Sequence, residues 1–140
     1  MEIIKKNLAQ LILVQSLIAT LTSLFFSEIL RLPPCILCWY QRIFMYPIVA
    51  ISAVSIWKKD KNLPFFVLPL SLIGTVIAFY HNLLYYKIIP ESLNPCTLGI
   101  SCTSKQIEVF GFITIPFMSL SAFIVIDLLA IFYLRLQKKN

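Results

Sequence analysis

The chain has 140 residues, of which 59% are hydrophobic and 13% are charged. So little polar surface excludes an ordinary soluble domain, and long uncharged apolar runs are typical of helices that span a membrane. The net charge of +6 does not indicate nucleic-acid binding, because the basic residues flank the apolar runs and form no face interleaved with aromatic side chains.

Four apolar runs follow one another along the chain, and each is long enough to cross a lipid bilayer as a helix. The first run is interpreted as an uncleaved span, because no small-x-small cleavage site of a secretory signal follows it. The sequence therefore predicts an all-α integral membrane protein, a single domain built as a four-transmembrane-helix bundle. The predicted spans cover residues 8–26, 35–57, 63–84 and 112–133.

The distribution of basic residues predicts the orientation of these spans. An even number of spans puts both termini on one side of the membrane. Eight of the twelve Lys and Arg residues fall in the segments on that side, and four fall in the segments on the opposite side. The positive-inside rule therefore predicts cytoplasmic termini and places both cysteine-bearing segments outside, where disulfides form and persist.

The second apolar run begins with a pair of cysteines. Cys35, Cys38 and Arg42 are spaced at i, i+3 and i+7, which places them on one face of a helix. Pro33 and Pro34 precede them and suit a helix start. The helix N-terminus and the arginine both favour a thiolate, so the stretch is interpreted as a redox-active dithiol. A structural disulfide or two buried thiols is the alternative.

Cys96 and Cys102 form a second pair, with five residues between them. Pro95 and Gly99 permit a tight bend, and a disulfide in so short a loop is better suited to exchange than to stabilisation. Three interpretations stay open: two disulfides that exchange with each other, two inert disulfides in a non-catalytic membrane subunit or assembly factor, and a four-thiolate zinc site. The five-residue spacing is unusual for zinc, so we expect no metal.

Three polar residues inside the spans are further candidates for a role. Arg42 could stabilise a thiolate or an anionic cofactor headgroup, or it could extend toward lipid phosphates. His81 could contact a cofactor carbonyl or move a proton, or it could simply be a paired polar residue. Asp127 would lie far from the cysteines, so we expect it to make a structural hydrogen bond.

The motifs resemble a known family of membrane disulfide oxidoreductases. The segment from Pro34 to Arg42 is similar to the signature of the DsbB family, and in particular to its BdbC-type members. Other matching segments are Met45-Tyr46-Pro47, Tyr80-His81, Pro95-Cys96 and Phe110-Gly111 with Pro116. The second cysteine pair departs from the enterobacterial DsbB proteins, whose loop between those cysteines is much longer.

The resemblance implies an enzyme of the bacterial cell membrane that reoxidises an extracytoplasmic thioredoxin-like thiol oxidase and passes electrons to a membrane quinone, either menaquinone or ubiquinone. It implies that the partner's thiolate attacks Cys96 and that the freed Cys102 attacks the Cys35–Cys38 disulfide. Cys38 would face the quinone. Arg42 would hold the quinone headgroup, and His81 would be a second contact.

Overall fold

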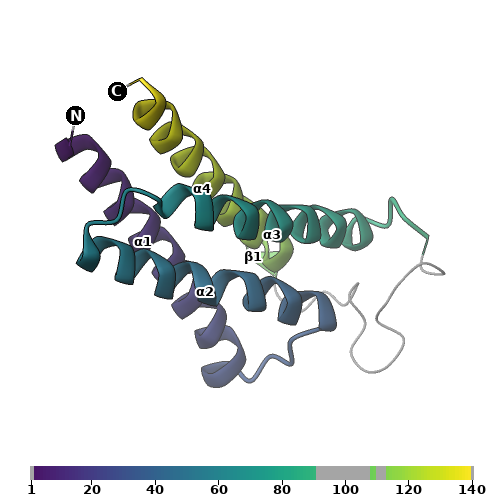
Figure 1. Cartoon of the computed structure of the whole chain (residues 1–140). Coiled ribbons are helices and arrows are strands. Elements are labelled where there is room, and N and C mark those ends of the chain that lie inside the picture. Colours follow the sequence, from purple (N-terminus) through teal and green to yellow (C-terminus); the bar gives the residue numbers. More distant parts are fainter. Residues whose placement is uncertain (1, 91–107, 110–112, 140) are drawn as a thin grey trace.

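The computed structural model describes residues 2–90, 108–109 and 113–139 (Figure 1). Cys96 and Cys102 lie outside the described residues. The described part is dominated by four helices, the first of which ends in a π-helical turn, and by one short antiparallel ladder. These elements are α1 (Glu2–Leu24), η1 (Phe25–Ile29), α2 (Ile36–Lys58), α3 (Leu63–Tyr85), β1 (Glu108–Val109), β2 (Ile113–Thr114) and α4 (Ile115–Lys138).

The four helices are each long and apolar enough to cross a membrane, which confirms the predicted fold class. The helix ends differ from the predicted spans by more than one residue only at the first and fourth helices, both of which also extend beyond their predicted ends, to Ile29 and Lys138. The first helix already begins at Glu2, because helical hydrogen bonding continues through the basic residues ahead of the apolar run. The fourth begins at Ile115, since Thr114 pairs with Glu108 in the ladder and then caps the helix by accepting a hydrogen bond from the Phe117 amide.

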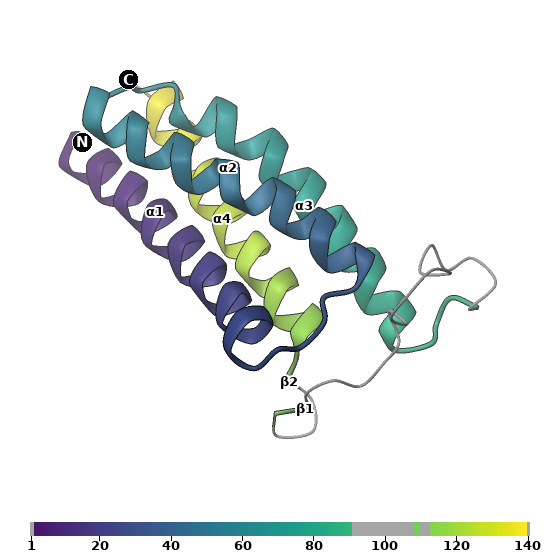
Figure 2. The same ribbon diagram turned by 90° about the horizontal axis from the view of Figure 1, so that it is seen from below.

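The helices form one bundle with both described ends of the chain at the same end (Figure 2). Consecutive helices pack against each other, and α4 also packs against α1, which closes the ring. The start of α2 and the short ladder lie at the opposite end of the bundle (Figures 1 and 2). This arrangement places the first cysteine pair far from the termini.

The centre of the bundle contains small side chains among larger apolar ones, and large apolar side chains also cover its outside. The small fully buried residues come from all four helices; they are Ser16, Ser52, Ser71, Ala78 and Ala130. Small residues let membrane helices approach closely. Leu21 and Val76 are instead 57% and 68% exposed on the outer surface. Such an apolar surface would be unfavourable in water, but it suits contact with the lipid tails of a membrane.

Asp127 links α4 to α3 within the bundle. Its carboxylate accepts hydrogen bonds from the Ser71 hydroxyl and, at 2.6 Å, from the Thr75 hydroxyl. A polar group inside an apolar bundle needs such partners, because water is not present to replace them. The aspartate therefore makes the structural hydrogen bonds that the sequence led us to expect.

Gly74 allows α3 to approach α4 closely. A Cβ atom at this position would overlap the ring of Phe123, whose side chain is fully buried. We therefore expect Gly74→Ala to lower the free energy of unfolding by about 1–3 kcal/mol, the usual cost of overpacking. Unfolding of the purified protein in mixed micelles of increasing denaturing detergent would measure the change.

Two further variants make this prediction specific. Phe123→Leu should recover part of the loss when it is combined with Gly74→Ala, because the smaller side chain leaves room for the added methyl group. Val76→Ala on the outer surface should have little effect. A Gly74→Ala protein as stable as the parent would show that the two helices are not in such close contact.

Candidate functional site

The first cysteine pair lies at the N-terminus of α2. Cys35 is the residue directly before the helix, with an extended backbone (φ −72°, ψ 169°), and its carbonyl accepts a hydrogen bond from the Trp39 amide. Cys38 follows in the first turn. The two Sγ atoms lie 3.2 Å apart, and both cysteines are free thiols. The prolines precede the cap residue, so they lead into the helix and do not form its first turn.

The surroundings of Cys35 favour its thiolate. Its side chain is only 7% exposed, and its Sγ atom lies 3.7 Å from Nε2 of His81. The hydrogen bond between the two sulfur atoms lowers the pKa of Cys35 below that of an ordinary thiol; burial opposes this change and His81 assists it. Because the thiolate is the nucleophile in disulfide exchange, the site provides a reactive sulfur at neutral pH.

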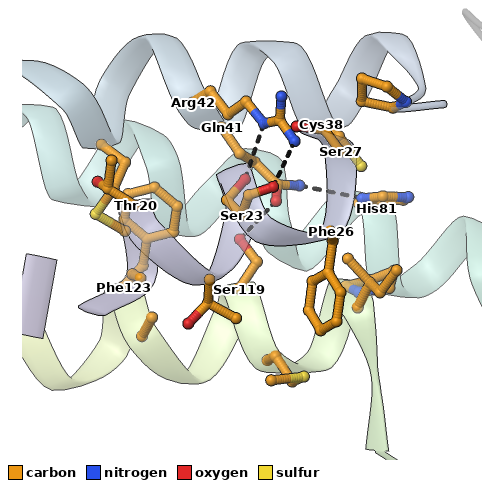
Figure 3. Close-up of a pocket in the computed structure, with 18 of the residues that line it drawn as sticks. Thr20, Ser23, Phe26, Ser27, Cys38, Gln41, Arg42, His81, Ser119 and Phe123 are labelled. Carbon is orange, nitrogen blue, oxygen red and sulfur yellow. Dashed lines mark hydrogen bonds between the residues drawn. The ribbon is translucent and has the colours of Figure 1, made fainter. Parts of the chain in front are cut away.

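Hydrogen bonds connect α4 to Cys35 by way of Gln41 and His81, and the two made by Gln41 are drawn in Figure 3. Ser119 donates its hydroxyl proton to Oε1 of Gln41 at 2.5 Å, and Nε2 of Gln41 donates to Nδ1 of His81 at 3.1 Å. Since Nδ1 accepts, the ring carries its proton on Nε2, which faces Cys35. The series of bonds therefore ends with a donor directed at the sulfur.

Arg42 follows Gln41 on α2 and is bound by α1. Its Nε atom donates to the Ser23 hydroxyl at 2.8 Å, and its Nη2 atom donates to the Ser23 carbonyl at 2.9 Å (Figure 3). Its Cζ atom also lies 5.5 Å from the centre of the Trp39 ring, a cation–π distance. The side chain is 8% exposed, so its charge is held inside the bundle and does not extend to the lipid surface.

A cavity of about 310 Å³ connects these groups. All four helices and η1 contribute to its wall, which is largely apolar. The polar residues of the wall include Cys35, Cys38, Gln41, Arg42, His81 and Ser119. Thr20 also lines the cavity, and its hydroxyl is buried without a hydrogen-bond partner among the described residues. An apolar cavity with a few convergent polar groups is typical of a site for a small molecule or cofactor.

Comparison with known proteins identifies the chain. Residues 5–133 match the family model of the disulfide bond formation protein DsbB. The chain belongs to the DsbB family. It is 46% identical over 115 residues to disulfide bond formation protein C of Bacillus subtilis strain 168, covering 81% of this chain and 82% of that protein. It is 41% identical to a probable disulfide formation protein of Metapseudomonas resinovorans, covering 92% and 90%.

No solved structure matches the chain. The family and the four apolar helices nevertheless agree on its class: it is a multi-pass membrane disulfide oxidoreductase. The match to disulfide formation protein C confirms the BdbC-like branch that the motifs indicated.

Cys35, Cys38 and His81 also present atoms that a metal ion could use, all within 4.8 Å of one another. Two thiolates and an imidazole are suitable zinc ligands. The observed hydrogen bonding favours thiol chemistry instead, because Nε2 of His81 points a proton at Cys35 where a metal would need a lone pair.

The structure brings together Cys35, Cys38, Arg42 and His81, the predicted site residues that it describes. Sequence reasoning did not assign roles to Ser23, which binds Arg42, to Gln41, which binds His81, or to Ser119, which binds Gln41. It also assigned no role to Thr20, which lines the cavity. A general signal was available, since a polar side chain inside an apolar span needs a partner. The identity of that partner depends on contacts between helices and could not be read from one chain segment.

The low pKa of Cys35 predicts unusual reactivity in acid. In a Cys96→Ser/Cys102→Ser background only Cys35 and Cys38 remain as cysteines. Because the pKa of Cys35 is lowered from that of an ordinary thiol, its alkylation by iodoacetamide should continue to a lower pH than alkylation of the same thiols in the denatured protein. The rate of alkylation against pH, followed by mass spectrometry, measures this.

The contradicting outcome is a rate that falls about tenfold for each pH unit below 9, as for an ordinary thiol. The denatured protein provides the matched control, because it has the same two thiols without the hydrogen bonds.

Proposed function

We propose that the protein is a quinone-linked thiol–disulfide oxidoreductase that reoxidises an extracytoplasmic thioredoxin-like thiol oxidase and so supports disulfide formation in exported proteins. One observation carries the proposal: the Cys35–Cys38 pair and Arg42 line the same largely apolar cavity inside a bundle of membrane-spanning helices. A lipid-soluble electron acceptor explains why the dithiol is placed inside such a bundle.

We place the enzyme in the bacterial cell membrane with its termini in the cytoplasm. The end of the bundle that carries the termini also carries most of the basic residues, which supports this orientation by the positive-inside rule. These residues are Lys5, Lys6, Lys58, Lys59, Lys61, Arg135, Lys138 and Lys139. The cysteines then face the extracytoplasmic side, where a secreted partner can reach them.

The cavity has the properties that a quinone headgroup needs. Its apolar wall suits a ring, and Arg42 and the unpartnered Thr20 hydroxyl provide hydrogen-bond donors for carbonyl oxygens. His81 lines the same cavity and remains a second candidate contact, although both of its nitrogens already have partners. A bound ubiquinone or menaquinone would supply a two-electron, two-proton acceptor.

The four cysteines can carry electrons from the partner to this site. We propose that the partner's thiolate attacks Cys96 of a Cys96–Cys102 disulfide, which forms a mixed disulfide and frees Cys102. Cys102 then attacks Cys35 of the Cys35–Cys38 disulfide, which forms a Cys35–Cys102 disulfide and releases Cys38, one helical turn from Arg42, beside the cavity. The partner's second thiolate displaces Cys96 from the mixed disulfide, and Cys96 displaces Cys35 from Cys102, which restores the Cys96–Cys102 disulfide and leaves Cys35 and Cys38 reduced. In the complete cycle the partner's dithiol loses two electrons and two protons, and the acceptor gains them.

Quinone reduction by the purified enzyme tests the proposal. Protein in detergent should reduce ubiquinone or menaquinone when it is given a reduced thioredoxin-like partner, and Cys35→Ser should abolish the reaction. Absorbance of the quinone measures turnover. Failure with both quinones, while the partner remains oxidisable by another disulfide, would contradict the proposed acceptor.

A pair of neighbouring variants tests the place of the headgroup in the same assay. Arg42→Met should raise the KM for quinone about tenfold, because it removes a charged hydrogen-bond donor from the cavity wall. Ile43→Met changes the next residue, which is exposed on the outside of the bundle, and should leave the KM unchanged. Equal effects of the two variants would place the headgroup elsewhere.

The proposed order of the cysteines predicts which variant traps the partner. Cys102→Ser leaves Cys96 as a free thiol, so its thiolate should open the disulfide of the oxidised partner and form a disulfide between the partner and Cys96, which no Cys102 is present to displace. The complex would appear as a reducible band on a non-reducing gel. Cys96→Ser should give no such band. If only Cys35 or Cys38 variants trap the partner, the order is wrong.

A further inference from the structure

Gln41 occupies a central position among the polar residues of the site. It lies on α2, accepts a hydrogen bond from Ser119 of α4 and donates one to His81 of α3. Gln41 and His81 are both buried. A buried polar side chain in an apolar bundle takes its orientation from such partners, so Ser119 fixes the rotation of the amide and the amide fixes the imidazole ring.

We propose that Gln41 and Ser119 are positioning residues for the redox pair: they hold His81 with its Nε2 proton directed at Cys35, and His81 in turn stabilises the Cys35 thiolate. The Gln41 amide lies on the far side of the ring from the sulfur, at Nδ1. Its effect on Cys35 therefore passes through the imidazole.

The physical basis is the choice between two forms of a neutral imidazole. With a donor at Nδ1, the ring keeps its proton on Nε2 and presents a hydrogen bond to the thiolate. Without that donor the proton can move to Nδ1, and a lone pair then faces the negatively charged sulfur. The first form stabilises the thiolate and the second does not.

The inference depends on Cys35–Cys38 being the reactive pair and not on the identity of the electron acceptor. A test that measures the thiolate directly can therefore succeed even if the proposed quinone is wrong. The other titratable or charged side chains that line the cavity come from α2 and α3, whereas α1 and α4 contribute uncharged ones. They are Cys38, Arg42, Tyr46 and Tyr85.

The experiment is a double-mutant cycle on the full chain in a Cys96→Ser/Cys102→Ser background. Titration of the reduced protein, followed by thiolate ultraviolet absorbance, gives the pH midpoint of the pair. Gln41→Leu should move the midpoint upward by about one pH unit, and His81→Ala should move it in the same direction. The Gln41→Leu/His81→Ala protein should match His81→Ala alone, because Gln41 acts through the ring.

Two variants complete the design. Thr75→Val removes a different hydrogen bond between α3 and α4, the one to Asp127, and should leave the midpoint unchanged. Ser119→Ala should move the pH midpoint upward by less than Gln41→Leu does, and only when His81 is present. If Gln41→Leu does not fold, this milder variant tests the positioning role in its place. An unchanged midpoint, or shifts that add to that of His81→Ala, would overturn the proposal.

Discussion

Two consecutive polar residues of α2 join that helix to the other three. Gln41 bonds to His81 of α3 and Ser119 of α4, and Arg42 bonds to Ser23 of α1. In a largely apolar bundle such hydrogen bonds restrict how the helices can pack, so these bonds help to fix how the four helices meet at this end. The cavity and the cysteine pair depend on that arrangement.

The hydrogen bonds of Gln41 and Arg42 that join the helices also position the groups that line the cavity. The hydrogen bond from Gln41 holds the imidazole of His81 with a donor beside Cys35. The hydrogen bonds of Arg42 to Ser23 hold its positive charge within the cavity wall. A reactive sulfur and a site suited to a small molecule therefore share one space. Disulfide chemistry from the protein side and electron transfer to a compound dissolved in the membrane can meet there.

The sequence predicted the features that depend on local pattern. Apolar run length gave the four helices, and helix periodicity placed Cys35, Cys38 and Arg42 on one face. The contacts of His81 were not predictable, because they join residues 40 to 46 positions apart along the chain. The start of α4 was placed early for a related reason, since the pairing of β2 with β1 depends on a contact that hydropathy does not report.

The most direct test of the account is the redox state of Cys35 and Cys38 in cells whose quinones are depleted. Rapid acid quenching followed by thiol alkylation would report it. The account predicts that the pair becomes reduced and alkylated, because its electrons have no acceptor. A pair that stays oxidised whatever the quinone supply would be an inert structural disulfide and would contradict the account.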